Sequence, residues 1–236
     1  MAYELYYWPT IQGRGEFVRL ALEEAGADYI DAARESEGFA VMLQMMEHGE
    51  RPPLAPPFLK DGDVVIGQTP AILLYLGARH GLAPKDPTGG LWTLQIQLTI
   101  SDFVAEIHDT HHPVAVSLYY EDQRQEALRR AAEFRNNRLP KFLGWFETIL
   151  SRNSANGAHL VGNAVTYADL SLFQVVEGLS YAFPKTTRRA LQDAPHVAAL
   201  HEAVARRPRI QAYLKSPRRI PFNEEGLFRH YPELDG

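Results

Sequence analysis

A hairpin that begins with two prolines is the feature that most limits how this chain can fold. Residues 55–69 read Ala-Pro-Pro-Phe-Leu-Lys-Asp-Gly-Asp-Val-Val-Ile-Gly-Gln-Thr. This order predicts a strand, a tight Asp-Gly turn, a second strand and a polar pair that opens a helix. Proline has no N–H to donate to a sheet, and X-Pro bonds have ready access to the cis form. Such a hairpin places free backbone groups and a hydroxyl near a helix N-terminus, where small anions bind.

Short alternating elements precede this hairpin. Residues 4–8 and 28–33 indicate strands, whereas residues 15–25 and 39–46 have helical spacing. A further helix is expected over residues 69–80. The first two strands are joined by a helix and should be parallel, while the hairpin strands should be antiparallel. We therefore expect an α/β domain over residues 1–81, in the order β-α-β-α-β-β-α.

The chain changes character after this domain. Residues 82–90 have the Pro- and Gly-rich composition of a linker. Beyond it, periodicity predicts helices over residues 91–120, 123–150, 167–183 and 194–214, and an irregular tail over residues 216–236. Thr166 and Asp169 fit a capping box at the start of the third of these helices. We expect an all-helical domain over residues 91–236.

Composition excludes several classes of protein. Hydrophobic residues make up 45% of the chain, which indicates a globular protein, and the net charge of −5 argues against a nucleic-acid or membrane surface. No apolar run reaches the roughly 18 residues of a membrane span, and the first residues do not resemble a signal peptide. The chain has no cysteine, which suits a cytoplasmic protein and excludes thiolate chemistry by its own side chains.

Taken in order, these pieces resemble the cytosolic glutathione transferases over nearly the whole chain. The matching segments are Leu5-Tyr6-Tyr7-Trp8, Gly13-Arg14-Gly15-Glu16 with Arg19, the proline-led hairpin with Gln68-Thr69, and the capping box with its flanking residues at 165–169. The resemblance implies a thioredoxin-like N-terminal domain followed by an all-α domain. It also implies a homodimeric enzyme of detoxification that activates glutathione, its co-substrate, for attack on a hydrophobic electrophile. The alternatives are a non-catalytic protein that binds glutathione or apolar ligands, and a glutathione-dependent isomerase or ether-cleaving enzyme.

The chemistry of the family requires an ionised thiol. An unperturbed thiol has a pKa of about 8.5, and only the thiolate is a good nucleophile. A hydroxyl that donates a hydrogen bond to the sulfur lowers that pKa. The resemblance assigns this role to Tyr7. The loop between Trp8 and Gly13 is one residue longer than is typical, so Thr10 and Tyr6 remain alternative donors, and Arg14 is a candidate for adding positive potential near the sulfur.

In this family, the residue before a cis-proline pairs its backbone with the cysteinyl part of glutathione. Counting back from the Gln-Thr pair favours Pro57 as the cis residue, which puts Pro56, with a carbonyl but no N–H, in the pairing position. If Pro56 is cis instead, Ala55 takes that position and keeps both groups.

Other parts of glutathione have separate candidates. Gln68 and Thr69 match the anchor for the γ-glutamyl group, and we expect Thr69 to cap its helix as well. His48 and Arg51 are candidates for the glycyl carboxylate. Asp102 is a candidate for reaching the amine of the glutathione bound to a partner subunit.

Three histidines at positions 108, 111 and 112 have the spacing of one helical face. Three imidazoles suit zinc, but Pro113 should disturb the helix, and no carboxylate beyond Asp109 has a matching position. We therefore expect no metal site. We assign to the electrophile pocket His108, His112, Tyr119 and, from the tail, Phe222, with Phe228 as a further tail residue that could close over it.

Overall fold

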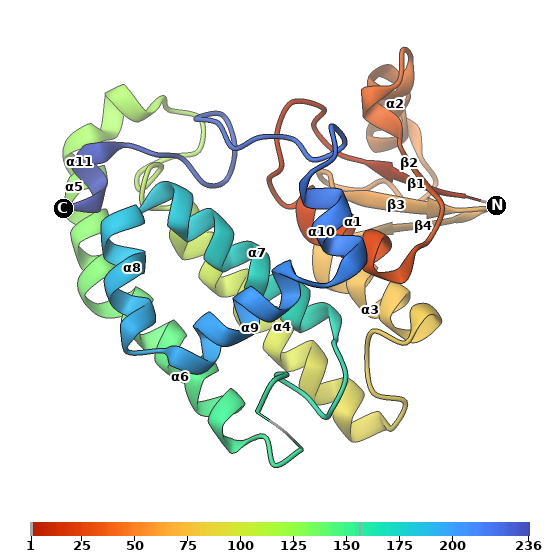
Figure 1. Cartoon of the computed structure of the whole chain (residues 1–236). Coiled ribbons are helices and arrows are strands. Elements are labelled where there is room, and N and C mark those ends of the chain that lie inside the picture. The colour runs from red at the N-terminus through yellow and green to blue at the C-terminus, as the bar shows by residue number, and fades with distance from the viewer. Residues whose placement is uncertain (1, 156) are drawn as a thin grey trace.

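The protein has an α/β domain beside a larger helical domain, as a computed structural model of residues 2–155 and 157–236 shows (Figure 1). The predicted order of the first domain is confirmed. Its elements are β1 (Tyr3–Tyr6), α1 (Gly15–Ala25), β2 (Tyr29–Asp31), α2 (Gly38–His48), β3 (Phe58–Asp61), β4 (Val64–Gly67) and α3 (Thr69–His80).

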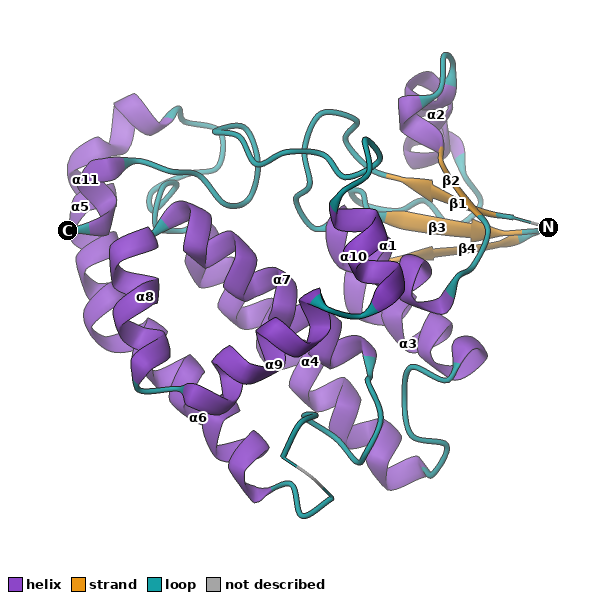
Figure 2. Ribbon diagram, in the orientation of Figure 1, coloured by secondary structure: helices purple, strands orange, loops and turns teal. Residues whose placement is uncertain are grey.

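The strands form one mixed sheet in the order β2-β1-β3-β4. As predicted, β1 is parallel to β2 and the β3–β4 hairpin is antiparallel. Side chains alternate across the sheet: Leu5 joins the main core, while the Tyr6 ring stacks on Phe58 in a smaller cluster. The smaller cluster includes Met42 of α2. Helices α1 and α3 therefore cover the face of the sheet that adjoins the helical domain, and α2 covers the other face (Figure 2).

The second domain is helical, as predicted. Its main elements are α4 (Pro87–His108), α5 (Arg124–Glu133), α6 (Leu139–Arg152), α7 (Tyr167–Ala182), α8 (Pro184–Gln192), α9 (Pro195–Ala205), α10 (Pro208–Leu214) and α11 (Pro232–Asp235). A π-helical turn at Phe134–Arg138 joins α5 to α6. None of the described helices is both long and apolar enough to span a membrane.

Several predicted boundaries are wrong. Helix α4 begins inside the expected linker, because the Asp86 side chain accepts a hydrogen bond from the Gly89 amide and so caps it. The same helix ends at His108 rather than near residue 120. The predicted helix over residues 194–214 is two helices, since Pro208 starts a new one. Helices α8 and α11 were not predicted, and α11 lies in the tail that was expected to be irregular.

The capping box at the start of α7 is confirmed. A carboxylate oxygen of Asp169 accepts hydrogen bonds from the Thr166 amide at 2.6 Å and the Thr166 hydroxyl at 2.7 Å. The other oxygen accepts from the Leu160 amide at 2.8 Å. Asp169 is fully buried, so this side chain orders both the helix start and the loop before it.

A chain of ion pairs connects the two domains. Arg19 of α1 is fully buried and pairs with Asp31 at 2.8 Å and Glu16 at 3.3 Å. Glu16 in turn pairs with Arg219 of the tail at 3.0 Å, and Arg219 pairs with Glu177 of α7 at 3.5 Å. The start of α1 is therefore tied electrostatically to the helical domain.

Glu106 of α4 offers a test of how stability depends on pH. Its carboxylate forms ion pairs with Arg138 at 2.6 Å and Arg130 at 3.3 Å. The hydrogen bond from Arg138 lowers the pKa of Glu106 below its ordinary value of 4.5, against the opposing effect of burial. A carboxyl group whose pKa is lowered by folding stabilises the folded state at pH values above its ordinary pKa. This stabilisation is lost as the pH falls through the pKa of the folded state. We expect Glu106→Gln to lower the free energy of unfolding by about 1 kcal/mol at neutral pH, with a smaller difference below pH 4.5.

Urea unfolding of both proteins at neutral and acidic pH measures this difference. Glu202→Gln is the matched control, because Glu202 is exposed and pairs with Arg206, which is also exposed and directly follows the same helix. A Glu106→Gln difference that stays constant with pH would show that the carboxylate charge is not the cause.

Candidate active site

Tyr7 lies directly after β1, at the end of the sheet that faces the helical domain. Its side chain is buried, and its hydroxyl accepts a hydrogen bond of 2.8 Å from the Arg14 amide. Two glycines make room for the ring: a Cβ at Gly13 would lie 2.1 Å from the hydroxyl oxygen, and one at Gly15 would lie 2.6 Å from the ring. The Gly-Arg-Gly segment is thus required for the position of Tyr7, and this reason is visible only in the structure.

The electrostatic surroundings keep the Tyr7 hydroxyl neutral. Burial raises the pKa of Tyr7, while the hydrogen bond from Arg14 and the charges of Arg14 and Arg19 oppose that rise. The Arg14 amide occupies an acceptor position on the oxygen, so the hydroxyl proton is available for donation. A neutral donor of this kind stabilises an adjacent anion by a hydrogen bond and does not act as a base.

The two alternative donors are oriented differently. The Tyr6 hydroxyl donates to Glu4 at 2.6 Å, and its ring packs on the α2 side of the sheet. Thr10 is exposed, and its carbonyl oxygen accepts a hydrogen bond from the Asn223 side chain at 3.0 Å. Of the three candidates, the structure places only Tyr7 against the start of α1.

The bond between Pro56 and Pro57 is cis, which confirms the prediction for Pro57 over Pro56. Both prolines are buried, directly before β3. The β1–β3 register pairs Tyr6 with Phe58, so its continuation by one residue places Pro57 beside Tyr7. Pro56 offers a carbonyl oxygen and no N–H to a ligand at this edge.

The N-terminus of α3 has an unusual backbone. Gln68, the residue that caps the helix, has φ = 67°, a left-handed conformation that is uncommon outside glycine. The expectation that Thr69 is the cap is wrong: it is the first helical residue, and its hydroxyl lies 3.5 Å from the Arg14 carbonyl oxygen. No acidic residue lies in the first turn. Amide groups without helical partners and the positive end of the helix dipole therefore favour an anion here.

A cavity of about 200 Å³ lies at this helix start, between α1, α3 and α4. We call it the α1–α3–α4 cavity. Gln97 is almost fully buried in its wall, and its Oε1 has no hydrogen-bond partner among the described residues. Gln97 and Ser101 were not among the predicted site residues, although polar residues four apart on an otherwise apolar helix were a usable signal. The lining residues are Arg14, Phe17, Gln68, Thr69, Pro70, Gln97, Leu98, Ile100, Ser101 and Val104.

Three predicted glutathione ligands lie elsewhere. Asp102 is exposed on α4 and does not line the α1–α3–α4 cavity. His48 is exposed at the end of α2, and Arg51 lines a separate cavity of about 280 Å³ beside β4. Their roles remain predictions.

Two of the predicted pocket residues come together near the tail. His112 and Tyr119 line an open cavity of about 490 Å³ between residues 112–121 and the C-terminal tail. Phe222 instead stacks on Tyr181 of α7, with ring centroids 4.9 Å apart. Phe228 is a core residue, packed so tightly on α7 that a Cβ at Gly178 would lie 2.4 Å from its ring.

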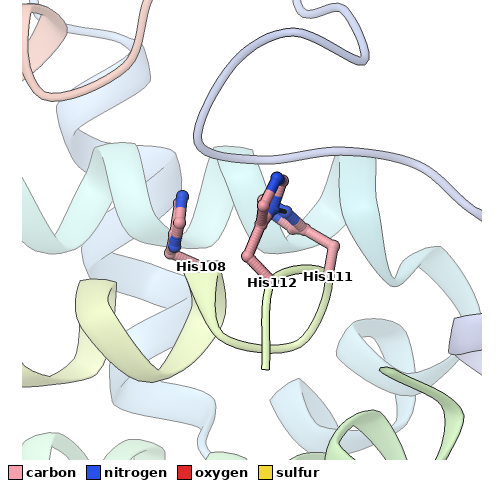
Figure 3. Close-up of side chains that lie close together, drawn as sticks. All are labelled: His108, His111 and His112. Atoms are coloured by element: carbon pink, nitrogen blue, oxygen red, sulfur yellow. Dashed lines mark hydrogen bonds between the residues drawn. The ribbon is translucent and has the colours of Figure 1, made fainter. Parts of the chain in front are cut away.

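His108, His111 and His112 gather as their spacing predicts. Helix α4 ends at His108, and the residues that follow form one further hydrogen-bonded turn, in which the amides of His111 and His112 both donate to the His108 carbonyl oxygen at 3.2 Å. Burial, together with the smaller effects of His112, Arg14 and Arg229, lowers the pKa of His108 to about 4. Figure 3 shows the three rings side by side, beneath the C-terminal segment.

Known proteins resemble this chain in both sequence and fold. Residues 108–217 match the family model described as glutathione S-transferase, C-terminal domain. The chain is 28% identical to glutathione S-transferase P of Bos taurus over 231 residues, covering 95% of this chain and 98% of that protein. It is 24% identical to a glutathione S-transferase of Plasmodium falciparum over 216 residues, covering 89% of this chain and 93% of the relative.

Solved structures agree with the fold. A Pi-class glutathione S-transferase of Onchocerca volvulus superposes with a TM-score of 0.74 at 23% identity, covering 96% of this chain and 99% of that one. Prostaglandin synthase D of Nilaparvata lugens superposes with a TM-score of 0.73 at 20% identity, covering 94% and 100%. The matched domain, the full-length similarity to curated relatives and the shared fold together indicate a member of the glutathione S-transferase family.

Proposed function

We propose that this protein is a glutathione transferase in which Tyr7 stabilises the thiolate of bound glutathione for attack on a hydrophobic electrophile. The observation that carries the proposal is the buried Tyr7 hydroxyl, which accepts from the Arg14 amide and has no hydrogen-bond acceptor for its proton among the described residues. This hydroxyl lies at the same end of strands β1 and β3 as the cis Pro56–Pro57 bond. The curated relatives, named as glutathione S-transferases, support the same activity.

Glutathione would lie across the ends of strands β1 and β3, with its γ-glutamyl end at α3. The carboxylate takes the positive end of α3, near Gln68 and Thr69. The ammonium group donates to the unpartnered Oε1 of Gln97 in the cavity wall. The cysteinyl backbone pairs with the Pro56 carbonyl, which leaves one fewer hydrogen bond than a residue with an N–H would supply.

The chemical step needs only a lowered thiol pKa and proximity. The thiol proton leaves to solvent, the sulfur forms a bond to the electrophilic carbon, and the leaving group departs with the electron pair of its bond. A hydrogen bond from Tyr7 that lowers the thiol pKa by about two units corresponds to roughly 2.7 kcal/mol of thiolate stabilisation. Binding the two reactants side by side supplies the remaining acceleration. His108, His112 and Tyr119 are proposed to border the electrophile.

A homodimer is part of the proposal. Helices α3 and α4 expose Leu74, Leu91 and Leu98, which are 42%, 67% and 50% exposed, and a second copy would cover these side chains. Asp102 on the same helix would then be positioned to reach the partner's ligand. Sedimentation analysis that finds only monomers would remove this part of the proposal.

Two measurements on the wild-type protein test the function. One is the conjugation of glutathione to an aromatic chloride, followed as chloride release and thioether formation. The other is calorimetric titration with glutathione. Binding together with conjugation supports the proposal, binding without conjugation indicates a non-catalytic binding protein, and no binding contradicts both.

Gln97→Met tests the placement of the γ-glutamyl group. A hydrogen bond to a charged group contributes about 1.5–3 kcal/mol, so we expect the Kd for glutathione to rise by roughly 10- to 100-fold. The thiol is remote from this contact, so kcat at saturating glutathione should change little. Calorimetry and steady-state kinetics measure the two effects.

Gln95→Met is the matched control, because Gln95 is exposed on the same helix and does not line the cavity. Equal Kd values for the wild type and Gln97→Met would place the γ-glutamyl ammonium elsewhere.

A further inference from the structure

A three-histidine cluster lies at the end of α4. The proposed thiol chemistry does not require three adjacent imidazoles. It is the only set of three or more potential metal-ligating side chains found together within residues 2–155 and 157–236. One nitrogen from each of His108, His111 and His112 lies within 4.8 Å of the other two. We propose that these three imidazoles form a binding site for a divalent transition-metal ion of the Zn²⁺ type, with a fourth coordination position left open.

The backbone brings the rings together without a long loop. The chain leaves α4 at His108 and turns at once, with both His111 and His112 amides bonded to the His108 carbonyl oxygen. The Thr110 hydroxyl donates to the Ile107 carbonyl oxygen at 2.7 Å, which fastens the same turn. The ligands are therefore supplied by one short turn whose hydrogen bonds hold the three residues near one another.

Hydrogen bonds also define which ring nitrogens can bind an ion. His111 Nε2 lies 3.0 Å from the Leu227 carbonyl oxygen, an acceptor, so Nε2 must carry the proton and Nδ1 keeps a free lone pair. Metal-binding histidines commonly donate their second ring N–H to such a carbonyl. His111 Nδ1 and His112 Nδ1 are 2.6 Å apart. His112 therefore donates in this pair, and can bind an ion through Nδ1 after moving that proton to its Nε2.

His111 and His112 are buried, and His108 is partly buried. A histidine must be unprotonated to bind a metal. Arg229 opposes cation binding, because its positive charge lies close enough to lower the pKa of all three histidines.

Zinc coordination requires a small rearrangement. Zn–N bonds of 2.0–2.1 Å in a tetrahedral site place the nitrogens about 3.4 Å apart. The distance between the His111 and His112 nitrogens must therefore increase, and the longest nitrogen–nitrogen distance in the cluster must decrease, each by roughly 1 Å. Ring rotation at the exposed side of His108 supplies such a movement, since its side chain is only partly buried. Three imidazoles without a carboxylate suit zinc, copper, nickel or cobalt rather than magnesium or calcium.

Cobalt provides a direct readout without glutathione or electrophile. Co²⁺ titrated into the metal-free full-length protein should give one equivalent of bound ion and the strong visible absorption of a four-coordinate site. Zn²⁺ should then displace it and remove the absorption. Because activity is not measured, failure of this test is separate from failure of the proposed function.

Substitutions of single histidines test which residues bind the ion. We expect His108→Ala and His112→Ala each to weaken Co²⁺ binding by at least about 100-fold. His48→Ala should have no effect, because His48 is exposed on α2. Arg229→Gln should tighten binding by up to about tenfold, because it removes a nearby positive charge. His108→Ala is the primary test, since the His111 ring also supports the tail through Leu227.

Two results would overturn the assignment. The first is the absence of stoichiometric Co²⁺ or Zn²⁺ binding by the wild-type protein. The second is binding that survives in His108→Ala and His112→Ala, which would place the ion on other histidines.

Discussion

Replacing Tyr7 with Phe should raise the pKa of the bound glutathione thiol by about two units and lower kcat/KM by about 100-fold at pH values below the wild-type thiol pKa. The ring stays in the space left by Gly13 and Gly15, so only the hydroxyl is removed. Below both thiol pKa values, the base-10 logarithm of the ratio of thiolate fractions equals the full pKa difference. The two proteins should converge as the pH rises above the thiol pKa of the variant.

The thiol pKa in the binary complex is read from the ultraviolet absorption of the thiolate, and kcat/KM from conjugation to an aromatic chloride across the pH range. Tyr6→Phe is the matched control, because the Tyr6 hydroxyl donates to Glu4 on the other face of the sheet. It should leave the thiol pKa unchanged. An unchanged thiol pKa in Tyr7→Phe would show that Tyr7 is not the donor. A raised thiol pKa in a Thr10→Val variant would then identify Thr10 as the donor.

Replacing Arg19 with Leu should lower the free energy of unfolding by about 3–5 kcal/mol, the loss expected when one member of a buried ion pair is removed. Arg19 is fully buried between Glu16 and Asp31. Burial by itself lowers the pKa of Arg19, but these carboxylates reverse the effect, so the guanidinium stays charged. Its removal leaves a buried Asp31–Glu16 region with less compensating charge.

Urea unfolding monitored by tryptophan fluorescence measures the loss. Arg206→Leu is the control, because Arg206 is exposed at the C-terminal end of α9 and its partner Glu202 is also exposed. Pairs of this kind contribute about 0.3–0.5 kcal/mol. Similar losses in the two variants would mean that the buried ion pairs of Arg19 do not stabilise the fold more than an exposed pair does. If Arg19→Leu does not fold, Arg19→Lys offers a milder change, since lysine keeps the charge but not the bidentate geometry.

Much of the fold follows from local signals. The α1 and α3 boundaries and the β3–β4 hairpin were predictable, because glycine caps, an Asp-Gly turn and alternating side chains act over a few residues. The end of α4 was not, since Gln123 binds the backbone of residues 114, 115 and 118 and so stabilises a non-helical segment. Helix α8 was missed because its start depends on Asp235, whose carboxylate accepts from the Lys185 and Thr186 amides.

The candidate site divides in the same way. Tyr7 and the proline-led turn carry patterns that can be read from the sequence, and the resemblance supplies their order. Gln97 was not predicted, because its importance depends on a buried oxygen without a partner, which is a property of packing. Thr69 was assigned the wrong capping role, because the left-handed backbone of Gln68 is not encoded by a glycine.

The sequence by itself determined the domain order, the family resemblance and the shortlist of hydroxyl donors, since each depends on residue types at short spacing. It left two registers open for the cis-proline, and the structure decided for the Pro56–Pro57 bond. Only the tertiary structure showed that the Tyr7 hydroxyl accepts from the Arg14 amide, and that the tail carbonyl of Leu227 lies against His111. Such contacts depend on how the segments pack in space, which residue spacing within one segment cannot specify.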